Sequence, residues 1–388
     1  MQQRKQRGAA VLFSLGIVVL LSTLGSAVLL RSLNETQLSR RSSARQGAFF
    51  LAEGGVDQAL LNLRTPTDLT DDVNTSALLT GTFTIDSPPV DLGNDRWQVT
   101  THGTAQQEQR TMQAVFQLTP QSVFQFALFG SQGVTISGNA TTNNYDSRLG
   151  SYASQTPGHN GDVGTNSTAV GGVTISGSIF VDGQVAVGQN VSNPTSVVTG
   201  YNPAFITGGT SPPTDTQDVV SQTTPFPMPT NPTNPPGGCN TNLPPLVGKT
   251  RTFLTGTNYC PPGIQTINGG ETWTANGMVK IYISDELKIN GNSTVGVASD
   301  PTLMRILMST GSAATMEGTI TGSTDVYAAI YGPQATINIS GNAKVFGAVI
   351  AKQVNVSGSA EIHYDEATAS ITDISNLYVT SVTSWREL

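Results

Sequence analysis

Residues 337–343 have the sequence Ile-Asn-Ile-Ser-Gly-Asn-Ala, and this pattern recurs four more times in the chain. The other copies lie at residues 134–140, 173–179, 287–293 and 354–360. In each copy two apolar residues flank a polar one, which is the alternation of a β-strand with one buried face. A Ser-Gly or Asn-Gly pair follows, as expected where the chain bends too sharply for a Cβ atom. The repeat therefore predicts short strands that each end at a glycine corner.

The spacing of the copies indicates how these strands are arranged. The last two copies begin 17 residues apart, and the first two begin 39 apart, or about two such units. Short strands that turn every 17 to 20 residues predict a parallel β-solenoid over residues 122–366, in which each turn stacks on the turn before it. An antiparallel β-sandwich is the alternative, because regular strand spacing suits both folds.

The composition of the 388 residues agrees with such a stack. Charged residues make up 12% of the chain, and the net charge is −7. Equivalent side chains of neighbouring turns lie above one another, so like charges repel there while Asn, Thr and Ser side chains form hydrogen bonds. The acidic balance argues against binding of nucleic acid. Two cysteines are too few for a scaffold built on disulfides.

The first 64 residues differ from the rest of the chain. They hold eight Lys and Arg residues and three acidic ones, and residues 9–30 carry no charge. As a helix this segment spans about 33 Å, which is enough to cross a bilayer. The basic residues Arg4, Lys5 and Arg7 precede it, so they are expected to stay in the cytoplasm while the chain after residue 30 lies outside.

A helical periodicity of apolar residues continues as far as residue 64, and Pro66 ends it. We therefore expect one long helix over residues 9–64, half in lipid and half outside. A secretory signal peptide is the alternative, but its apolar core is shorter and is followed by a cleavage site and a loop.

The residues at the start of this helix resemble the leader of type IV prepilins. Residues 7–12 read Arg-Gly-Ala-Ala-Val-Leu, and residues 46–64, with Phe-Phe-Leu-Ala-Glu-Gly-Gly-Val at 49–56, resemble the end of a PilX-type N-terminal domain. The similarity is to minor pilins of this type and to the K-type pseudopilins of type II secretion. It implies that a prepilin peptidase cleaves after Gly8 and leaves Ala9 as the mature N-terminus.

One position departs from the pilin pattern. Phe13 stands at the fifth position of the mature chain, where most pilins carry a glutamate. In those pilins the carboxylate is thought to meet the terminal amine of a neighbouring subunit, since a lone carboxylate in an apolar core is costly. The departure favours a minor or tip subunit over a repeating shaft subunit.

Three segments after the helix read as strands. Residues 79–85, 96–101 and 109–118 are separated by glycine and proline residues, and the last of them alternates apolar and polar residues cleanly. They predict a small antiparallel sheet on the outer half of the helix, which is also the general layout of pilin heads.

Four further segments resemble a β-solenoid domain of bacterial proteins that carry a PilX-type N-terminus. They are residues 144–147 (Asn-Tyr-Asp-Ser), 160–166 (Asn-Gly-Asp-Val-Gly-Thr-Asn), 329–333 (Ala-Ile-Tyr-Gly-Pro) and 362–367 (Ile-His-Tyr-Asp-Glu-Ala). This resemblance assigns no biochemical role.

Residues 201–245 hold eleven of the 21 prolines. We expect an extended loop that projects from the solenoid as a spacer, with a groove-type binding partner as the alternative. Cys239 and Cys260 are the only cysteines, and outside the cytoplasm they are expected to form a disulfide at the base of this insert. A metal site would need more ligands than these two.

Candidate catalytic residues are few. Enzymes that cleave polysaccharides need clustered carboxylates or a basic residue. Asp146, Asp162 and Asp182 could converge across neighbouring turns, but Asp at a corner usually serves the turn itself. We therefore expect no catalytic residue, no metal site and no cofactor.

None of the histidines has metal-ligand spacing, so each is expected to be structural or on the surface: His102, His159 and His363. Residues 363–366 (His-Tyr-Asp-Glu) are expected to cap the last turn, where open strand edges need cover. Calcium binding by Asp365 and Glu366 is the alternative. Trp385 in the C-terminal tail is expected to pack back on the solenoid.

The sequence thus predicts an α+β region followed by an all-β region. Its segments are a leader (1–8), a transmembrane and pilin-like helix (9–64), a small antiparallel β region (65–121), a first solenoid part (122–200), a Pro-rich insert (201–245), a second solenoid part (246–366) and a tail (367–388).

These segments predict a non-enzymatic type IV pilus assembly protein or minor pilin. It would be a single-pass protein of the bacterial inner membrane before assembly and would then display the solenoid on the pilus or cell surface. Its expected partners are the prepilin peptidase, other minor pilins and pilus assembly components. The alternatives are a membrane-anchored adhesin or glycan-binding protein outside a filament, and a β-helix enzyme that degrades polysaccharides.

Overall fold

The structure, a computed structural model, describes residues 3–62, 75–78, 81–86, 89–207, 218–230, 235–308, 316–374 and 377–388. It divides into a first unit, Met1–Thr119 with Tyr378–Leu388, and a second unit, Pro120–Leu377. In sequence, the second unit is therefore inserted into the first. The ends of the second unit lie side by side, because the Gln121 N–H donates to the Leu377 carbonyl at 2.8 Å.

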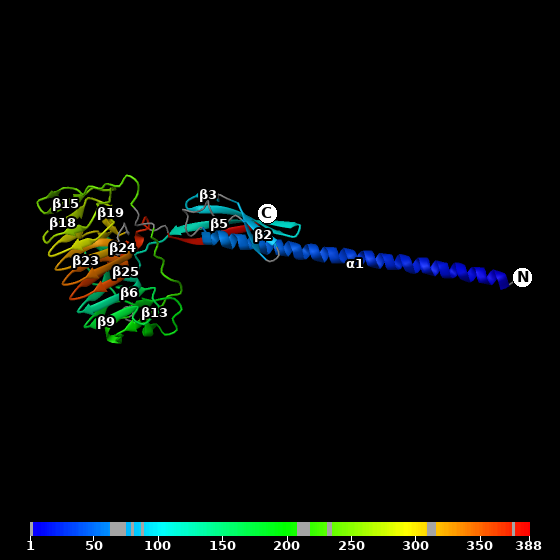
Figure 1. The fold of residues 1–388 in the computed structure, drawn as a ribbon, viewed down its shortest axis with the longest axis horizontal. Helices are drawn as coiled ribbons and strands as arrows, with labels where there is room; N and C mark the ends of the chain where they lie inside the picture. The colour runs from blue at the N-terminus through cyan, green and yellow to red at the C-terminus, as the bar shows by residue number, and fades with distance from the viewer. Residues whose placement is uncertain are drawn as a thin grey trace. The chain divides into compact units, whose positions relative to one another are not determined.

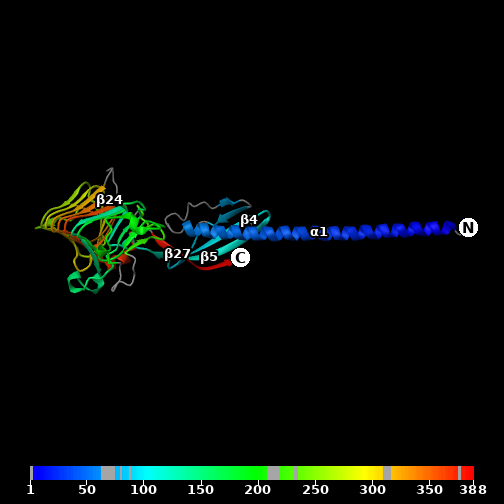
Figure 2. The same cartoon turned by 90° about the horizontal axis from the view of Figure 1, so that it is seen from below.

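The first unit combines one long helix with one sheet. The helix α1 spans Gln3–Asn62 (Figures 1 and 2). The sheet has the order β1-β2-β4-β5-β27 with β3 paired to β4, and the pairs among β1 to β5 are antiparallel. Its strands are β1 (Thr75–Leu78), β2 (Gly81–Ile85), β3 (Val90–Gly93), β4 (Arg96–Ala105), β5 (Glu108–Pro120) and β27 (Tyr378–Glu387). The three predicted strands are present as β2, β4 and β5, although residues 79–80 and the predicted helix stop at Pro66 lie outside the described residues.

The C-terminal half of α1 packs against one face of this sheet. Ala52 and Val56 of α1 share a core with Val99 and Phe116. The Thr101 hydroxyl donates to the Ala52 carbonyl at 2.7 Å. Along β4 and β5 buried residues alternate with more exposed ones, as the two-residue period of a strand requires. The antiparallel sheet that was expected on the outer half of the helix is therefore present.

The C-terminal tail does not pack on the repeat region, where we expected it. Strand β27 joins the first unit's sheet beside β5, and Trp385 on it is 59% exposed. The Arg110 guanidinium pairs with Glu387 at 2.8 Å, and the Leu388 N–H donates to the Thr111 carbonyl. The expectation that Trp385 packs on the repeat region is wrong, because β27 completes an edge of another sheet.

The second unit is one 21-stranded sheet, called the stack below (Figure 1). Its strands are β6 (Leu128–Gly138), β7 (Thr141–Tyr145), β8 (Val163–Thr165), β9 (Val173–Gly177), β10 (Phe180–Val181), β11 (Val185–Val187), β12 (Val198–Thr199), β13 (Val219–Ser221), β14 (Leu246–Val247), β15 (Thr250–Phe253), β16 (Asn258–Tyr259), β17 (Gln265–Ile267), β18 (Thr272–Ala275), β19 (Val279–Ile283), β20 (Leu287–Ile289), β21 (Thr294–Gly296), β22 (Met304–Met308), β23 (Met316–Ile320), β24 (Asp325–Ile339), β25 (Lys344–Val356) and β26 (Glu361–Asp365). Its 3-10 helices are η2 (Ser147–Leu149), η3 (Tyr152–Ser154), η4 (Pro194–Val197), η5 (Pro203–Phe205), η7 (Pro301–Leu303) and η8 (Glu366–Ser370). Among the described strands of the stack, β14 and β15 pair antiparallel and the other registered pairs are parallel.

The five repeat copies lie in one column across the stack. Ile337 pairs with Val354, Val354 with Val134, and Val134 with Val173. The copy that begins at Leu287 joins the column through Gly318, which pairs with both Leu287 and Ile337. Each copy of the repeat therefore occupies the same strand position in its own turn of the stack.

The glycine corner of each copy has a physical cause. Gly341, Gly358, Gly138 and Gly177 all have φ between +76° and +102°, a region that favours glycine. A Cβ atom on Gly358 would lie 2.7 Å from the Gly341 carbonyl oxygen, and one on Gly138 would lie 2.5 Å from that of Gly358. The corners stack backbone on backbone, so a side chain there would separate neighbouring turns.

The order of turns differs from the predicted one. Strand β6, the first of the stack in sequence, pairs with β25, and β7 pairs with β26. The turns that follow β6 continue from there to β13, so β13 and β15 lie at opposite ends of the stack (Figure 1). The expectation that each turn stacks on the turn before it is wrong at this seam, defined here as the β25–β6 pair.

The Pro-rich insert connects the two ends of the stack. Phe226 is buried against Phe126 and Phe129, with ring centroids 5.3 and 4.5 Å apart. The Tyr331 hydroxyl donates to the Pro229 carbonyl at 2.6 Å. In its described part, residues 201–207, 218–230 and 235–245, the insert therefore contains residues packed on the stack, which contradicts the expected projecting loop. Residues 208–217 and 231–234 of the predicted insert lie outside the described part.

Candidate functional site

The N-terminal half of α1 is an exposed apolar surface. Large apolar side chains are exposed from Phe13 to Leu38; Leu21, for example, is 64% exposed and Val28 is 66% exposed. The most apolar 18-residue window has a mean hydropathy of 2.3, and none of it is buried. By length and composition α1 is therefore able to cross a membrane.

Hydroxyl groups within this apolar surface are satisfied by the helix itself. The Ser22 hydroxyl donates to the Val19 carbonyl at 3.0 Å, Thr23 to Leu20 at 2.9 Å, and Ser26 to Ser22 at 2.8 Å. In hydrocarbon, each unsatisfied polar group costs roughly several kcal/mol of free energy. These internal bonds make the segment compatible with lipid or with an apolar filament core.

The predicted cleavage site lies within the same helix. Gly8 and Ala9 belong to α1 at its N-terminal end. Their side-chain surroundings lie outside the described part of the chain, so cleavage after Gly8 stays a prediction.

The three carboxylates considered as candidate catalytic residues, Asp146, Asp162 and Asp182, have separate partners. Asp146 pairs with Arg148 at 2.7 Å, and the hydrogen bond from Arg148 lowers the pKa of Asp146. Asp162 accepts the Gln184 N–H at 2.7 Å, and burial raises the pKa of Asp162. The first of these serves a turn and the second joins neighbouring turns, which are the structural roles expected of Asp at corners.

Asp182 instead forms a hydrogen-bonded pair with a histidine. The His159 Nδ1 lies 2.5 Å from Asp182 Oδ1, and the Thr207 hydroxyl donates to the same oxygen at 2.8 Å. Asp182 is buried, while the His159 side chain is 35% exposed. The pair could orient His159 as a general base, but the neighbouring hydroxyl is bound to the carboxylate and not to the imidazole.

Asp365 and Glu366 lie within the stack and not on its end. The Asp365 Oδ1 accepts the N–H of Ser147 at 2.8 Å and that of Ala367 at 3.1 Å, and burial raises the pKa of Asp365. The Glu366 Oε1 accepts the Asn144 amide at 2.6 Å. The expectation that residues 363–366 cap the last turn is wrong, because β26 is paired on one side with β25 and on the other with β7.

His363 stands in a column of aromatic rings. The ring of Phe346 lies between Tyr327, at a centroid distance of 4.5 Å, and His363, at 4.7 Å, and Tyr152 lies 3.9 Å from His363. His363 is 2% exposed, and its Nδ1 lies 2.7 Å from the Asn143 Oδ1. Burial lowers the pKa of His363 to about 4; nearby Glu361 opposes this shift and Lys344 adds to it. The side chain is therefore neutral at pH 7.

Acidification is expected to weaken the second unit through His363. Its folded pKa of about 4 lies below the unfolded value of about 6.5, so the unfolded chain binds the proton first as the pH falls. The stabilisation is complete above pH 6.5 and is lost as the pH falls towards 4, by at most about 3 kcal/mol. Urea midpoints of the full chain in detergent between pH 7.5 and pH 4.5 measure it. The control His363→Phe keeps a ring in the column without a titrating group, and an unchanged pH dependence in this variant would contradict the prediction.

Within the described residues no group of three or more His, Cys, Asp or Glu side chains could hold a metal ion. The third histidine, His102, lies on β4 with its Nδ1 2.9 Å from the Thr111 hydroxyl and its Nε2 3.2 Å from Asp86. In the part of the chain that the structure describes, the candidate histidines and carboxylates therefore each bind neighbouring groups of the fold and do not gather in one cluster.

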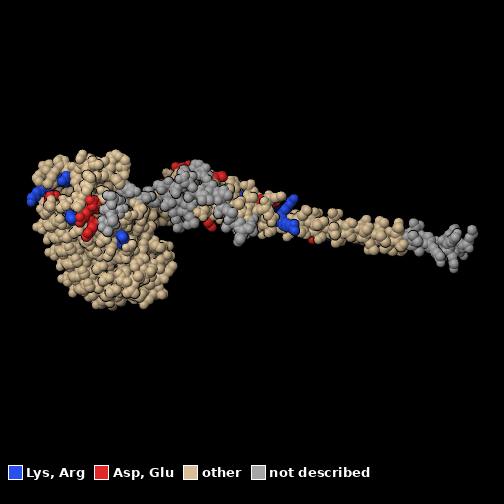
Figure 3. Space-filling view, in the orientation of Figure 1, with Lys and Arg blue, Asp and Glu red and all other residues tan. Residues whose placement is uncertain are grey.

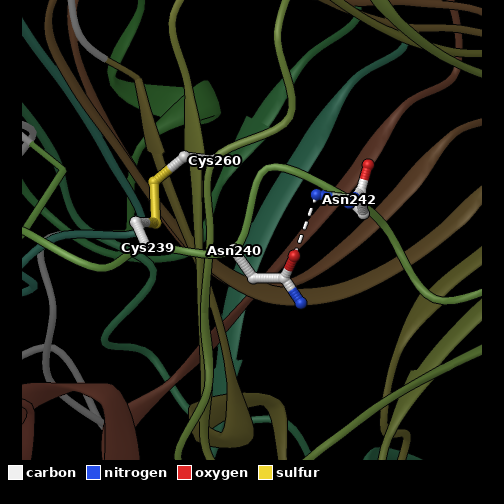
Figure 4. The surroundings of a disulfide bond; sticks show 4 residues. All are labelled: Cys239, Asn240, Asn242 and Cys260. Atoms are coloured by element: carbon white, nitrogen blue, oxygen red, sulfur yellow. Dashed lines mark hydrogen bonds between the residues drawn. A yellow bond between two sulfur atoms is a disulfide. The ribbon is translucent and has the colours of Figure 1, made fainter.

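Cys239 and Cys260 form a disulfide in the structure, with Cα atoms 5.9 Å apart (Figure 4). Next to it, the Asn242 N–H donates to the Asn240 Oδ1 at 2.9 Å, and the Cys260 N–H donates to the Asn240 carbonyl at 2.8 Å. The disulfide joins the end of the insert, at Cys239, to the turn of the stack that contains β16, at Cys260. Closing a loop of this size stabilises a fold by about 3 kcal/mol.

Three interactions could not be found from the sequence. Asp373 pairs with Lys280 at 2.9 Å and with Arg305, which ties the segment after η8 to β19 and β22. Asn144 and Glu366 meet although 222 residues separate them. No local pattern marks such pairs, because their separations depend on the order in which turns stack.

Comparisons with known proteins give limited matches. Residues 264–371 match a family described as a domain of unknown function, DUF7305. No curated protein matches the chain. The competence-associated pilin ComZ from Thermus thermophilus is 14% identical with a TM-score of 0.26, covering 89% of this chain and 97% of that chain. The DUF3494 domain of an ice-binding protein from Shewanella frigidimarina is 14% identical with a TM-score of 0.30, covering 64% of this chain and 99% of that chain.

Proposed function

We propose that the chain is a non-enzymatic minor pilin that displays its second unit at a pilus tip or on the cell surface. One observation carries the proposal. The helix α1 is apolar and exposed from Phe13 to Leu30, and one face of the same helix is buried against an antiparallel sheet from Ala44 onward. Such a helix has one half suited to lipid or a filament core and one half that anchors a folded head.

The proposal includes a PilX-type N-terminus with a prepilin leader. A prepilin peptidase removes residues 1–8, the protein resides in the bacterial inner membrane as a single-pass protein, and assembly moves it to the pilus or cell surface. Its partners are other minor pilins and pilus assembly components. The resemblance of residues 7–12 and 46–64 to such proteins supports this part.

The displayed part is proposed to be a parallel β-solenoid. The column of repeat copies and the parallel registers support this description. The proposal assigns it no catalytic activity, which is supported by the separate partners of Asp146, Asp162 and Asp182.

Replacing Gly8 by a bulky residue, Gly8→Gln, tests the proposal. A peptidase that cleaves after a glycine must fit the backbone closely at that point, so we expect complete loss of processing and of surface display. Mass spectrometry of the membrane-fraction protein should find Ala9 as the N-terminus of the unaltered chain and Met1 in the variant. Surface labelling of the second unit measures display, and Gln2→Ala is the control within the leader. Normal display of Gly8→Gln would favour a membrane-anchored protein outside a filament.

A further inference from the structure

Strand β27 lies at the end of the first unit's sheet, beside β5 (Figure 2). At one end of this pair the Gln121 N–H donates to the Leu377 carbonyl. At the other end the Leu388 N–H donates to the Thr111 carbonyl, so β27 runs antiparallel to β5. Among the described strands none pairs with the other side of β27. We call this side of residues 378–387 the β27 edge; its backbone N–H and C=O groups can pair with a further strand.

The β27 edge lacks features that usually protect a free edge from pairing. Residues 378–385 read Tyr-Val-Thr-Ser-Val-Thr-Ser-Trp, without a charge, a proline or a glycine. A short strand, a lysine or a proline is the usual protection, whereas an uncharged run with high β propensity pairs readily. Strand β3, by contrast, has four residues and a shift in its register with β4. The β27 edge is therefore suited to receive a strand.

One side of β27 faces the same way as α1. Glu387 lines a hollow of about 340 Å³ together with Phe49 and Phe50 of α1. Side chains two residues apart point to the same side of a strand, so Trp385 shares the side of Glu387. Trp385 is 59% exposed, and Phe50 is 65% exposed. The side of β27 that faces α1 therefore offers aromatic surface and a hollow to an added strand.

The charged groups around this hollow already have partners within the chain. Arg45 and Arg110, which line the hollow, each pair with a glutamate, at 3.2 and 2.8 Å. Arg386 donates to the Gln113 side chain at 2.7 Å. Basic side chains gather instead on α1 (Figure 3). A partner at the β27 edge is therefore held by backbone hydrogen bonds and apolar contacts, and not by charge.

A second copy of the chain is a poor partner for the β27 edge. A Cβ atom on Gly47 would lie 3.3 Å from the Ala105 Cβ, and one on Gly55 would lie 3.1 Å from the Thr101 Cβ. The helix α1 therefore runs antiparallel to β4, and also to β27, because β5 is antiparallel to both strands. Two β27 strands paired antiparallel would point their α1 helices in opposite directions, which one membrane does not allow. Two copies paired parallel about a two-fold axis would turn equivalent side chains to opposite faces, whereas paired residues share a face.

We propose that the β27 edge binds an extended segment of a different envelope protein, which joins the sheet of the first unit as a further strand. Backbone hydrogen bonds to β27 give the affinity, and the spacing of side chains gives the specificity. Apolar residues at alternate positions of the segment cover Trp385, and one of them enters the hollow beside Phe50. The pairing deepens the proposed function, because it gives a tip subunit one partner of stated kind through a single edge.

Photoreactive side chains placed one at a time along β27 of the full chain test this pairing in cells. Benzoylphenylalanine replaces Val379, Ser381, Thr383 or Trp385, and the cross-linked peptides are identified by mass. We expect one partner protein, whose cross-linked residue moves by two for each two-residue step along β27, because paired strands keep a fixed register. The control places the same group at Leu92 on β3, which is 40% exposed, and should give no such series.

The variant Trp385→Pro distinguishes strand pairing from contact with the indole ring alone. The Leu388 N–H points to β5, so by alternation the Trp385 N–H points to the free edge, and a proline there leaves the pairing with β5 intact. We expect the cross-linked yield from position 383 to fall about tenfold in Trp385→Pro and about threefold in Trp385→Thr, which keeps the N–H. Hydrogen exchange of the β5 amides should be equal in the two variants.

Four results would overturn the pairing: no product above the Leu92 control, cross-links to many proteins without a constant step, a product of two copies of this chain, or a yield in Trp385→Pro no lower than in Trp385→Thr. Surface display of the second unit and removal of residues 1–8 are measured in the same cells. Normal display and processing without the series of cross-links would refute the strand pairing and leave the pilin role standing. The series from a chain that is neither processed nor displayed would refute the pilin role and keep the pairing.

Discussion

Replacing Ile136 by aspartate is expected to unfold both halves of the second unit together. The first half is residues 122–222, and the second half begins at residue 246. Ile136 on β6 is 1% exposed, and it pairs with Val356 on β25 and with Ile175 on β9. A carboxylate at this position has no partner for its charge or its hydrogen bonds, so we expect a loss of at least about 4 kcal/mol. Because the seam lies between the two halves, the damage reaches turns on both sides of it.

Limited proteolysis of the full chain in detergent, with the fragments identified by mass, measures this effect. Cleavage should appear both before residue 222 and after residue 246 in Ile136→Asp. The matched control Val247→Asp places the same charge on β14, where the side chain is 74% exposed, and should leave the digestion pattern unchanged. Cleavage confined to residues 122–222 would contradict the prediction and indicate that the two halves fold separately.

Replacing Gly103 by alanine is expected to loosen α1 from the sheet of the first unit. A Cβ atom on Gly103 would lie well inside van der Waals distance of the Ala48 carbonyl oxygen and of the Ala52 nitrogen. Both of these are backbone atoms of a helix and cannot rotate away. Overpacking of this kind costs about 1 to 3 kcal/mol, and a backbone contact belongs at the upper end of that range.

Hydrogen exchange of the full chain in dilute detergent reports this loss locally. Amides of β4 and β5 should exchange faster in Gly103→Ala, while those of the second unit keep their rates. Gly54→Ala is the matched control, since the new methyl group meets nothing within 4 Å and removes a helix glycine that costs about 1 kcal/mol. Equal exchange in the two variants would show that the close approach of β4 to α1 is not required for stability.

The resemblance to pilins supports one part of the proposed function, and the structure supports another. The resemblance rests on residues 7–12 and 46–64, which lie on α1, and it carries no information on what the second unit binds. The structure adds the packing of Ala52 and Val56 beneath the sheet.

Local periodicity was sufficient for the elements themselves. Continuous apolar residues and helical periodicity predicted α1. Strand-like segments between glycine and proline residues predicted β2, β4 and β5, with clean alternation in the last of them. The repeated Ser-Gly or Asn-Gly pair predicted the corners that Gly138, Gly341 and Gly358 form. Each of these patterns acts over a few residues, through helix geometry, strand pleat or a left-handed φ, so the sequence alone determines it.

Only the tertiary structure decided which turns are neighbours. The repeats at residues 134–140 and 354–360 look alike in sequence and meet at the seam, and the insert with buried Phe226 then connects the two ends of the stack. Similar turns present similar edges, so local sequence does not distinguish a turn's true neighbour from another copy. The same holds for β27, whose alternation suits any sheet edge. Pairing between distant strands depends on the packing of whole surfaces, and that information is absent from any one segment of the chain.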